Sequence, residues 1–271
     1  MVNITPDSFS DGGRFFDPGA AVQHGLEMLE QGADLIDLGA ESTRPGGSSV
    51  YGAGASDVPA EEELRRLLPV LRGLRRQTTA PLSVDTRKAA VAQAALDEGA
   101  DLVNDVSALG DPEMGALLSQ SAVPVILMHS RGTLDTMQRD IRFDDVVGEV
   151  RAELAAVADR AVAAGIARER LILDPGIGFG KTAEQNLQLL REVAAFTSLG
   201  RPLLIGASRK SFLGHVTGAP PAARLPGSLA AAAWAALSGV SLLRVHDVAE
   251  TVQFLRVLAS IGAPNSAESA P

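Results

Sequence analysis

The chain has 271 residues, 46% of them hydrophobic, and a formal net charge of −9. This length is typical of a single α/β barrel, and the negative charge argues against nonspecific nucleic-acid binding, which needs a basic surface. The absence of cysteine excludes disulfides, thiolate metal sites and a cysteine nucleophile. Because the N-terminus lacks the charged and apolar regions of a signal peptide and no apolar run reaches about 18 residues, we expect a soluble, cytoplasmic protein with no membrane contact.

Short apolar runs alternate with segments of helical spacing along the chain. The predicted helical segments are 20–31, 61–76, 89–98, 112–121, 145–164, 182–196, a segment that begins at Lys210, 228–237 and 248–258. The predicted strands are 1–2, 34–38, 81–84, 102–103, 123–128, 171–173, 203–205 and 241–245. This alternation predicts a (β/α)8 TIM barrel of the α/β class, as a single domain over residues 1–261 followed by a disordered tail at 262–271.

The first strand is nearly absent from the sequence, because only Met1 and Val2 precede the polar residue Asn3. Strands are usually about five or six residues long, so the chain begins where a strand should already be ending. Two alternatives stay open: the true start lies upstream, or the barrel begins with a stub. A stub is expected to leave backbone groups of its neighbours unpaired and to loosen the anchor of Asn3.

Polar residues follow the strands, and barrels of this kind place their active sites on the face where all strand C-termini lie. Asp85, Asn104 and Asp174 directly follow apolar runs. Because buried carboxylates are costly unless they are hydrogen-bonded, this set suits a ligand with a row of N–H donors, such as a guanidine-like or pterin edge. Two structural alternatives stay open: Asp85 could cap the next helix, and Asp174, followed by Pro-Gly, could form a turn.

Residues 174–181 form a glycine-rich loop between a strand and a helix. The loop lacks the G-x-x-x-x-G-K-[ST] spacing of a phosphate-binding loop, so we do not expect a nucleotide site. Its aromatic residue, Phe179, has little core to join among the glycines. We interpret Phe179 as a lid over a flat ligand, with a structural plug as the alternative.

Cationic residues gather after the last two strands. Residues 208–211 lie between a strand and a helix start, where backbone N–H groups favour an anion. Arg244 and His246 have period-two spacing, so both side chains are expected to point the same way, and together they suit a phosphate or pyrophosphate. The alternative for Arg244 is a structural ion pair with Asp247 or Glu250.

The loops at 3–13 and 40–59 are long, polar and rich in glycine, as mobile loops that close over a site would be. Arg44, in the second of them, is a further candidate ligand for the anion. At two other strand ends, we expect Asp37 and His129 to have structural roles.

Several of these segments together resemble dihydropteroate synthases. The most specific are 3–13 and 37–46, and the others follow in the family's order at 84–86, 104–105, 174–181, 208–211 and 244–246. The resemblance extends from Asn3 to about Glu250. It implies a (β/α)8 barrel that condenses 6-hydroxymethyl-7,8-dihydropterin pyrophosphate with 4-aminobenzoate, giving 7,8-dihydropteroate and pyrophosphate in folate biosynthesis.

The resemblance also implies roles for individual residues. By the family pattern, the pterin is held by Asp85, Asn104, Asp174 and Lys210. Pyrophosphate is bound by Asn3, Arg44, Arg244 and His246, with Asn3 also beside Mg2+, the expected cofactor. The 4-aminobenzoate site is shaped by Thr43, Pro45, Phe179 and Ser211, and the mobile first loop contains Asp7 and Ser8. The chemistry itself is assigned to Asp85, Lys210, Arg244 and His246.

The same resemblance implies small-molecule substrates, a homodimer packed through late helices and a target of sulfonamides. Loss of pyrophosphate leaves a cation at the pterin methylene, which the weakly nucleophilic arylamine then attacks in an S_N1-like path. Such a path requires no strong general base, in keeping with the absence of a recognisable catalytic triad. Two other readings stay open: a corrinoid-linked methyltetrahydrofolate methyltransferase, which would have no use for an Arg/His pyrophosphate site, and a catalytically silent pterin-binding paralogue.

Overall fold

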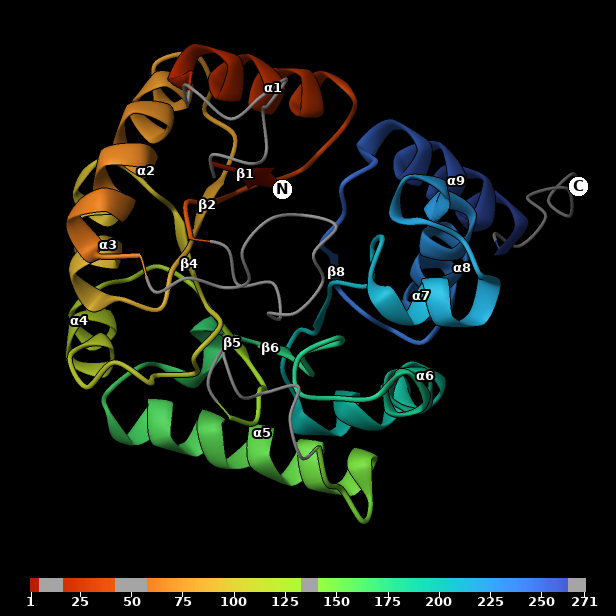
Figure 1. Ribbon diagram of the computed structural model, residues 1–271. Helices are drawn as coiled ribbons and strands as arrows, with labels where there is room; N and C mark the ends of the chain where they lie inside the picture. Colours follow the sequence, from red (N-terminus) through yellow and green to blue (C-terminus); the bar gives the residue numbers. More distant parts are fainter. Residues whose placement is uncertain (5–16, 42–57, 133–140, 263–271) are drawn as a thin grey trace, which may run out of the picture.

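The computed structural model describes residues 1–4, 17–41, 58–132 and 141–262, in which strands and helices alternate (Figure 1). The strands of these segments are β1 (Val2–Asn3), β2 (Ile36–Gly39), β3 (Leu82–Asp85), β4 (Leu102–Asp105), β5 (Val125–Met128), β6 (Leu171–Asp174), β7 (Leu204–Ile205) and β8 (Leu242–Leu243). The α-helices are α1 (Pro18–Glu30), α2 (Ala60–Arg75), α3 (Ala89–Asp97), α4 (Met114–Gln120), α5 (Val146–Ala163), α6 (Ala183–Arg191), α7 (Ser211–Thr217), α8 (Leu225–Leu237) and α9 (Val248–Gly262). Short 3-10 helices cover Arg168–Arg170, Val193–Leu199 and Pro221–Ala223.

The strands form a ring of parallel neighbours in chain order. β1 to β6 pair consecutively in one sheet, and β7 pairs with β8. A parallel bridge between Leu173 and Leu203 joins β6 to the segment that enters β7. On the other side, the amino group of Met1 donates to the carbonyl of Val245 at 3.0 Å, which joins β1 to the segment after β8. The prediction of a (β/α)8 barrel is confirmed.

The first strand is a real, two-residue member of the ring. Val2 pairs with Leu38 and Asn3 pairs with Gly39 of β2. The N–H of Ile4 also donates to the carbonyl of Gly39 at 2.6 Å. The stub therefore pairs with backbone groups of β2 at the end nearest the strand C-termini.

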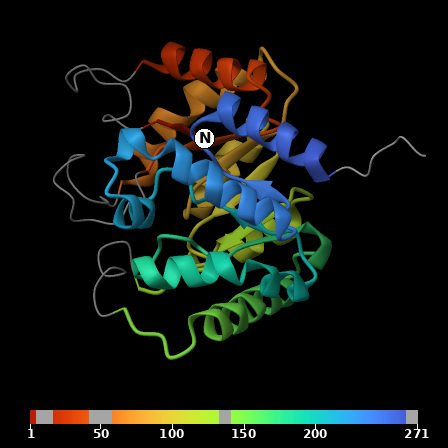
Figure 2. The same ribbon diagram turned by 90° about the vertical axis from the view of Figure 1, so that its right-hand side faces the viewer.

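The helices surround the strands, and α8 and α9 cover the side of the barrel that faces the viewer in Figure 2. Several boundaries differ from the predictions. α4 begins at Met114, so Pro112 precedes the helix and does not occupy its first turn. The predicted helix 182–196 ends at Arg191 and continues as the 3-10 helix Val193–Leu199, whereas α9 extends beyond its predicted end to Gly262. The first residue of the predicted tail, Gly262, is thus the last residue of α9, and the rest of that tail lies outside the described residues.

Two apolar layers position the site. The larger layer fills the space between the strands and the helices. The smaller one lies inside the barrel and takes one residue from each of six strand segments, and we call it the inner apolar layer: Leu35, Leu102, Ile126, Ile172, Leu204 and Leu242. Because side chains alternate across a strand, the residues two positions later point to the same interior, one step nearer the strand C-termini. These next residues are Asp37, Asn104, Met128, Asp174, Gly206 and Arg244.

Among the described segments, no helix combines the length and apolar character needed to cross a membrane.

Candidate active site

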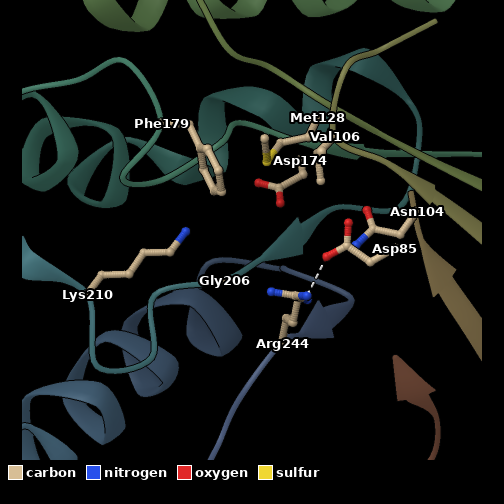
Figure 3. A pocket seen from close by; sticks show the side chains of 9 residues that line it. All are labelled: Asp85, Asn104, Val106, Met128, Asp174, Phe179, Gly206, Lys210 and Arg244. Carbon is tan, nitrogen blue, oxygen red and sulfur yellow. Dashed lines mark hydrogen bonds and ion pairs between the residues drawn. The ribbon is translucent and has the colours of Figure 1, made fainter. Parts of the chain in front are cut away.

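A pocket opens above the inner apolar layer at the C-terminal ends of the strands (Figure 3). Its lining comes from the C-terminal ends of the six strands β3 to β8 and from the loops that follow them: Asp85, Asn104, Val106, Met128, Asp174, Phe179, Gly206, Lys210 and Arg244. The structure thus brings together all four residues expected to hold the pterin, together with Phe179 and Arg244. Residues that lie more than 150 positions apart in the sequence share this pocket, as Asp85 and Arg244 do.

Arg244 lies between two carboxylates of neighbouring strands. Its Nε donates to Oδ2 of Asp37 at 2.6 Å, and its Nη2 donates to Oδ2 of Asp85 at 2.6 Å. The predicted alternative, an ion pair with Asp247 or Glu250, is wrong because Asp247 is paired with Arg209. Burial opposes the charge on Arg244, but the two carboxylates outweigh it and raise the pKa of the guanidinium.

The two carboxylates beside Arg244 have opposite pKa shifts. Burial raises the pKa of Asp85 to about 7, although the charge of Arg244 lowers it. Burial also acts on Asp37, but the charge of Arg244 outweighs it, so the pKa of Asp37 is lowered. Asp37 is therefore a carboxylate at neutral pH, whereas Asp85 exchanges a proton there.

Asp85 does not cap the following helix, so that alternative is wrong. The residue at the N-cap of α3 is Lys88, and no side chain caps this helix end. Instead, Oδ2 of Asp85 accepts from Arg244, while the buried Oδ1 has no hydrogen-bond partner among the described residues. A buried acceptor without a partner is costly, so this oxygen is suited to an N–H donor of a ligand.

Asn104 and Asp174 supply further polar groups from β4 and β6. The amide of Asn104 is 3.5 Å from Oδ2 of Asp37, which is a weak contact, and most of its capacity is left for a ligand. Oδ1 of Asp174 accepts from the N–H of Gly176 at 2.7 Å, so the predicted turn role is correct. The same carboxylate also lines the pocket, and the two roles are compatible because each carboxylate oxygen can accept separately.

Lys181 holds the glycine-rich loop in place from behind. Its ammonium is buried and lies 3.0 Å from Nδ1 of His129, 3.0 Å from the carbonyl of Gly176 and 2.8 Å from the carbonyl of Phe179. Burial, with the nearby charge of Lys181, lowers the pKa of His129 to about 4, so its ring is neutral and accepts at Nδ1. Its Nε2 then donates to Glu153 at 2.8 Å, which agrees with the structural role expected for His129.

Phe179 and Lys210 face each other at the pocket (Figure 3). The ammonium of Lys210 lies 4.5 Å from the centre of the Phe179 ring and donates to the carbonyl of Ile177. Burial lowers the pKa of Lys210 to about 8, against the attraction of Asp174. A cation beside an aromatic face and a carboxylate can contact both a flat ring and an oxygen of a ligand.

Other predicted site residues lie outside this pocket. His246 does not line it, and its Nδ1 is 3.0 Å from Oγ of Ser208 instead. Ser211 is the first residue of α7, as expected, and is exposed. Asn3 is half-buried at the end of β1. The remaining predicted residues lie outside the described segments: Asp7, Ser8, Thr43, Arg44 and Pro45.

The sequence reasoning missed Met128, Val106 and Gly206, and it did not assign Lys181 a function. At the end of β5 it singled out His129, but Met128 is the residue that lines the pocket. Counting by two from Ile126 of the inner apolar layer would have selected Met128, because His129 has the opposite parity. Lys181 carried no local signal, since only the folded loop brings it to His129.

The family described as pterin binding enzymes matches residues 1–246. The chain is 44% identical to the dihydropteroate synthase of a Synechocystis strain over 95% of this chain and 87% of the relative. It superposes on a Yersinia pestis dihydropteroate synthase in a sulfonamide drug complex with a TM-score of 0.89, at 42% identity, covering 97% of this chain and 93% of the other.

A third similar protein is the Xanthomonas albilineans dihydropteroate synthase in complex with 7,8-dihydropteroate. Its TM-score is 0.85, its identity is 45%, and the match covers 97% of this chain and 92% of the other. These relatives are named synthases and not methyltransferases, so the methyltransferase reading finds no support among them. On this evidence from sequence and structure, the chain belongs to the dihydropteroate synthase family of pterin-binding enzymes.

Proposed function

We propose that the chain catalyses its family's reaction in folate biosynthesis, as a transferase. It condenses 6-hydroxymethyl-7,8-dihydropterin pyrophosphate with 4-aminobenzoate and releases 7,8-dihydropteroate and pyrophosphate. The observation that carries the proposal is the pocket that gathers Asp85, Asn104 and Asp174 opposite two cations, Lys210 and Arg244. Acceptors on one side and cations on the other suit a ligand that joins an N–H-rich ring to an anionic leaving group.

The pterin edge is held by the three polar residues of β3, β4 and β6. The unpartnered Oδ1 of Asp85 and the carboxylate of Asp174 accept from the N–H groups of the ring. Asn104 can both accept and donate, so it matches a ring edge that alternates N–H groups with acceptors. Lys210 donates to a ring acceptor from the opposite side, between Phe179 and Asp174.

The pyrophosphate is bound by Arg244 and His246, with Arg44 and Asn3. Arg244 presents a planar set of donors, and the charge that builds on the leaving oxygen is stabilised by such cations. Mg2+ commonly uses few protein ligands and completes its shell with waters and substrate phosphates. A single amide oxygen from Asn3 fits this pattern, and no group of three or more His, Asp or Glu in the described segments is placed to hold a metal. When bound, Mg2+ supplies positive charge to the pyrophosphate oxygens.

The reaction follows from these charges. The C–O bond to pyrophosphate breaks with its electron pair on oxygen, and the resulting cation at the pterin methylene is delocalised into the ring. The carboxylates of Asp85 and Asp174 stabilise this cation from the ring edge. The amine of 4-aminobenzoate then forms the C–N bond and loses a proton to solvent. Because the electrophile is strong, no residue needs to activate the weakly nucleophilic amine.

The 4-aminobenzoate is placed by Thr43, Pro45, Phe179 and Ser211. Phe179 offers its ring beside Lys210, and a flat aromatic acid can stack on it. Ser211 begins α7, where backbone N–H groups are available to a carboxylate. The proposed site for the acid therefore lies between the glycine-rich loop and the start of α7.

We also propose a cytoplasmic homodimer that packs through α7, α8 and α9. Five large hydrophobic side chains are exposed on these three helices, which lie side by side in Figure 1: Val216, Trp234, Leu237, Val257 and Ile261. Leu237 is 72% exposed and Ile261 is 77% exposed. Exposed apolar groups concentrated on neighbouring helices indicate a protein interface.

The test is pyrophosphate release by the purified chain, with each substrate alone and with both. We expect release that depends on both substrates and on Mg2+, and that is lost on chelation. Arg244→Ala and Lys210→Ala should each reduce turnover by about a hundredfold or more, as the loss of a charge-stabilising donor does. Binding of the pterin without turnover would favour the silent paralogue, and near-normal turnover in both variants would refute the assigned roles.

A further inference from the structure

Arg244 has two carboxylate partners, but only one of them faces the pocket. Asp85 lines the pocket, whereas Asp37 is absent from the lining although its distance to Arg244 is the same, 2.6 Å. Figure 3 shows Asp85 on one side of the guanidinium and the Lys210 ammonium across the pocket on the other. The strand register explains the difference in depth. In the pairing of β2 with β3, Asp37 lies beside Ser83, whereas Asp85 lies beside Gly39, two residues nearer the strand C-termini. Asp37 is therefore nearer the inner apolar layer than Asp85 is.

Gly39 is the neighbour of Asp85 on β2. A Cβ at position 39 would lie 3.5 Å from Cβ and 3.6 Å from Oδ2 of Asp85, which is ordinary van der Waals contact. Two positions before this glycine, Asp37 is buried, as Asp85 is, and its Oδ1 likewise has no hydrogen-bond partner among the described residues. What separates Asp37 from Asp85 is that it does not line the pocket and lies nearer the inner apolar layer, while its carboxylate is close enough to fix the guanidinium.

The ligand-binding step creates a conflict that Asp37 can resolve. If Asp85 accepts from the pterin, its negative charge is shared between the ring and Arg244. A buried guanidinium that loses part of its counter-charge is destabilised and tends to move. Resting on the proposed function, we propose that Asp37 is a positioning residue: it holds Nε of Arg244 as a permanent counter-charge, so that Asp85 can turn to the pterin while the guanidinium stays directed at the leaving pyrophosphate.

The charges around the pair support this division of roles. Asp37 remains ionised because Arg244, helped by the N-terminal amino group of Met1, outweighs the effect of burial on its pKa. The pKa of Asp85 is raised to about 7 by burial, and the negative charge of Asp37 adds to that rise. Other charged groups also face Asp85 from their elements: Arg244 and Lys210 favour its ionised form, Glu41 and Glu63 oppose it, and Asp174 lines the same pocket.

The first test is Asp37→Asn, which keeps the shape of the side chain and removes its charge. Asp85 then becomes the sole anionic partner of Arg244 and loses a repelling neighbour, so its pKa must fall. Fluorescence titration with 6-hydroxymethylpterin between pH 5.5 and 9, a range of about two units either side of neutrality, measures the affinity against pH. The acid limb of this profile is the pH region in which the affinity falls on acidification, because Asp85 becomes protonated. We expect a limb near pH 7 in the unmodified chain, and a limb about one unit lower in the variant.

The same variant should separate the two substrates kinetically. The KM for pterin pyrophosphate is expected to rise by about tenfold or more, since one partner of a buried charge pair is gone, while the KM for 4-aminobenzoate is unchanged. The matched control is Asp105→Asn, another buried carboxylate at a strand end, whose side chain, among the described residues, accepts from Ser107 and Leu109 of its own turn. This control should leave the limb and both KM values in place. An unmoved limb in Asp37→Asn, or an equal rise of both KM values, overturns the proposal.

A stability test is independent of turnover and needs only purified protein. Arg244→Met removes the cation that is paired with Asp37 and leaves only the weaker attraction of the N-terminal amino group of Met1, so we expect a lower Tm. Adding Asp37→Asn to Arg244→Met should recover part of that Tm, whereas adding Asp105→Asn should not. Absence of recovery overturns the proposal even if the single Asp37 variant fails to fold. Failure of the proposed reaction is a distinct result, because it would abolish pyrophosphate release in the unmodified chain without changing this coupling.

Discussion

Gly176→Ala should damage both the fold and the site, because the loop passes close to the end of β5. Gly176 has a φ of +69°, a conformation that side-chain-bearing residues rarely adopt. A Cβ on this residue would lie 1.9 Å from the carbonyl oxygen of His129. That oxygen cannot move without a large cost in free energy, because the residue is held at two points. The N–H of His129 donates to the carbonyl of Asp174 at 2.8 Å, and the ammonium of Lys181 is 3.0 Å from Nδ1 of the His129 ring.

The cost has two parts, and a second glycine separates them. The left-handed conformation costs about 1–2 kcal/mol for a residue with a Cβ. Relieving the collision by shifting the backbone costs about 1–3 kcal/mol more. Gly200 has a nearly equal φ of +66°, is exposed, and has nothing within 4 Å of the added Cβ. Gly200→Ala should therefore lower the free energy of unfolding by about 1–2 kcal/mol, and Gly176→Ala by about 2–5 kcal/mol.

Urea unfolding of the two variants under matched conditions measures this difference, and pyrophosphate release measures its effect on function. Moving Gly176 displaces the carbonyl that accepts from Lys181 and the N–H that donates to Asp174. Gly176→Ala should therefore raise the KM for pterin pyrophosphate, whereas Gly200→Ala should leave it unchanged. Equal losses of stability in the two variants, or an unchanged KM in Gly176→Ala, would refute the reasoning.

Three further predictions follow from other contacts. Phe179→Ala should raise the KM for 4-aminobenzoate severalfold with little change in Tm, because the ring is only half-buried; a large fall in Tm with unchanged KM would instead identify it as a plug. Burial lowers the pKa of Lys181 from 10.5 to about 7, so the unfolded chain binds this proton more tightly, and stability should rise with pH through that window. Lys181→Met should reduce this rise, measured as the free energy of unfolding against pH, and an identical slope would count against it. Leu237→Glu should convert a dimer to a monomer in sedimentation, while Val162→Glu, an exposed residue on α5, should not; a dimer that survives Leu237→Glu argues against the α7–α9 interface.

The sequence by itself determined the architecture and most of the pterin-binding set. Alternating apolar runs and helical segments are enough to predict a parallel barrel, because each strand buried on both faces must be covered by a helix. Asp85, Asn104 and Asp174 were found because each directly follows an apolar run, and parallel strands end on one face. These are local patterns, and the fold converts them into one pocket without further information.

Partner choice was decided only by the tertiary structure. The sequence offered Asp247 and Glu250 to Arg244 because they are near in the chain, but the guanidinium pairs with Asp37, 207 positions away, and with Asp85. The barrel's closure through β8 and β1 brings these strand ends together, and no local pattern encodes which side chain lies one layer deeper. Strand register decides whether a side chain points into the barrel and how far it lies from the strand C-termini. Register is fixed by the packing of all eight strands at once.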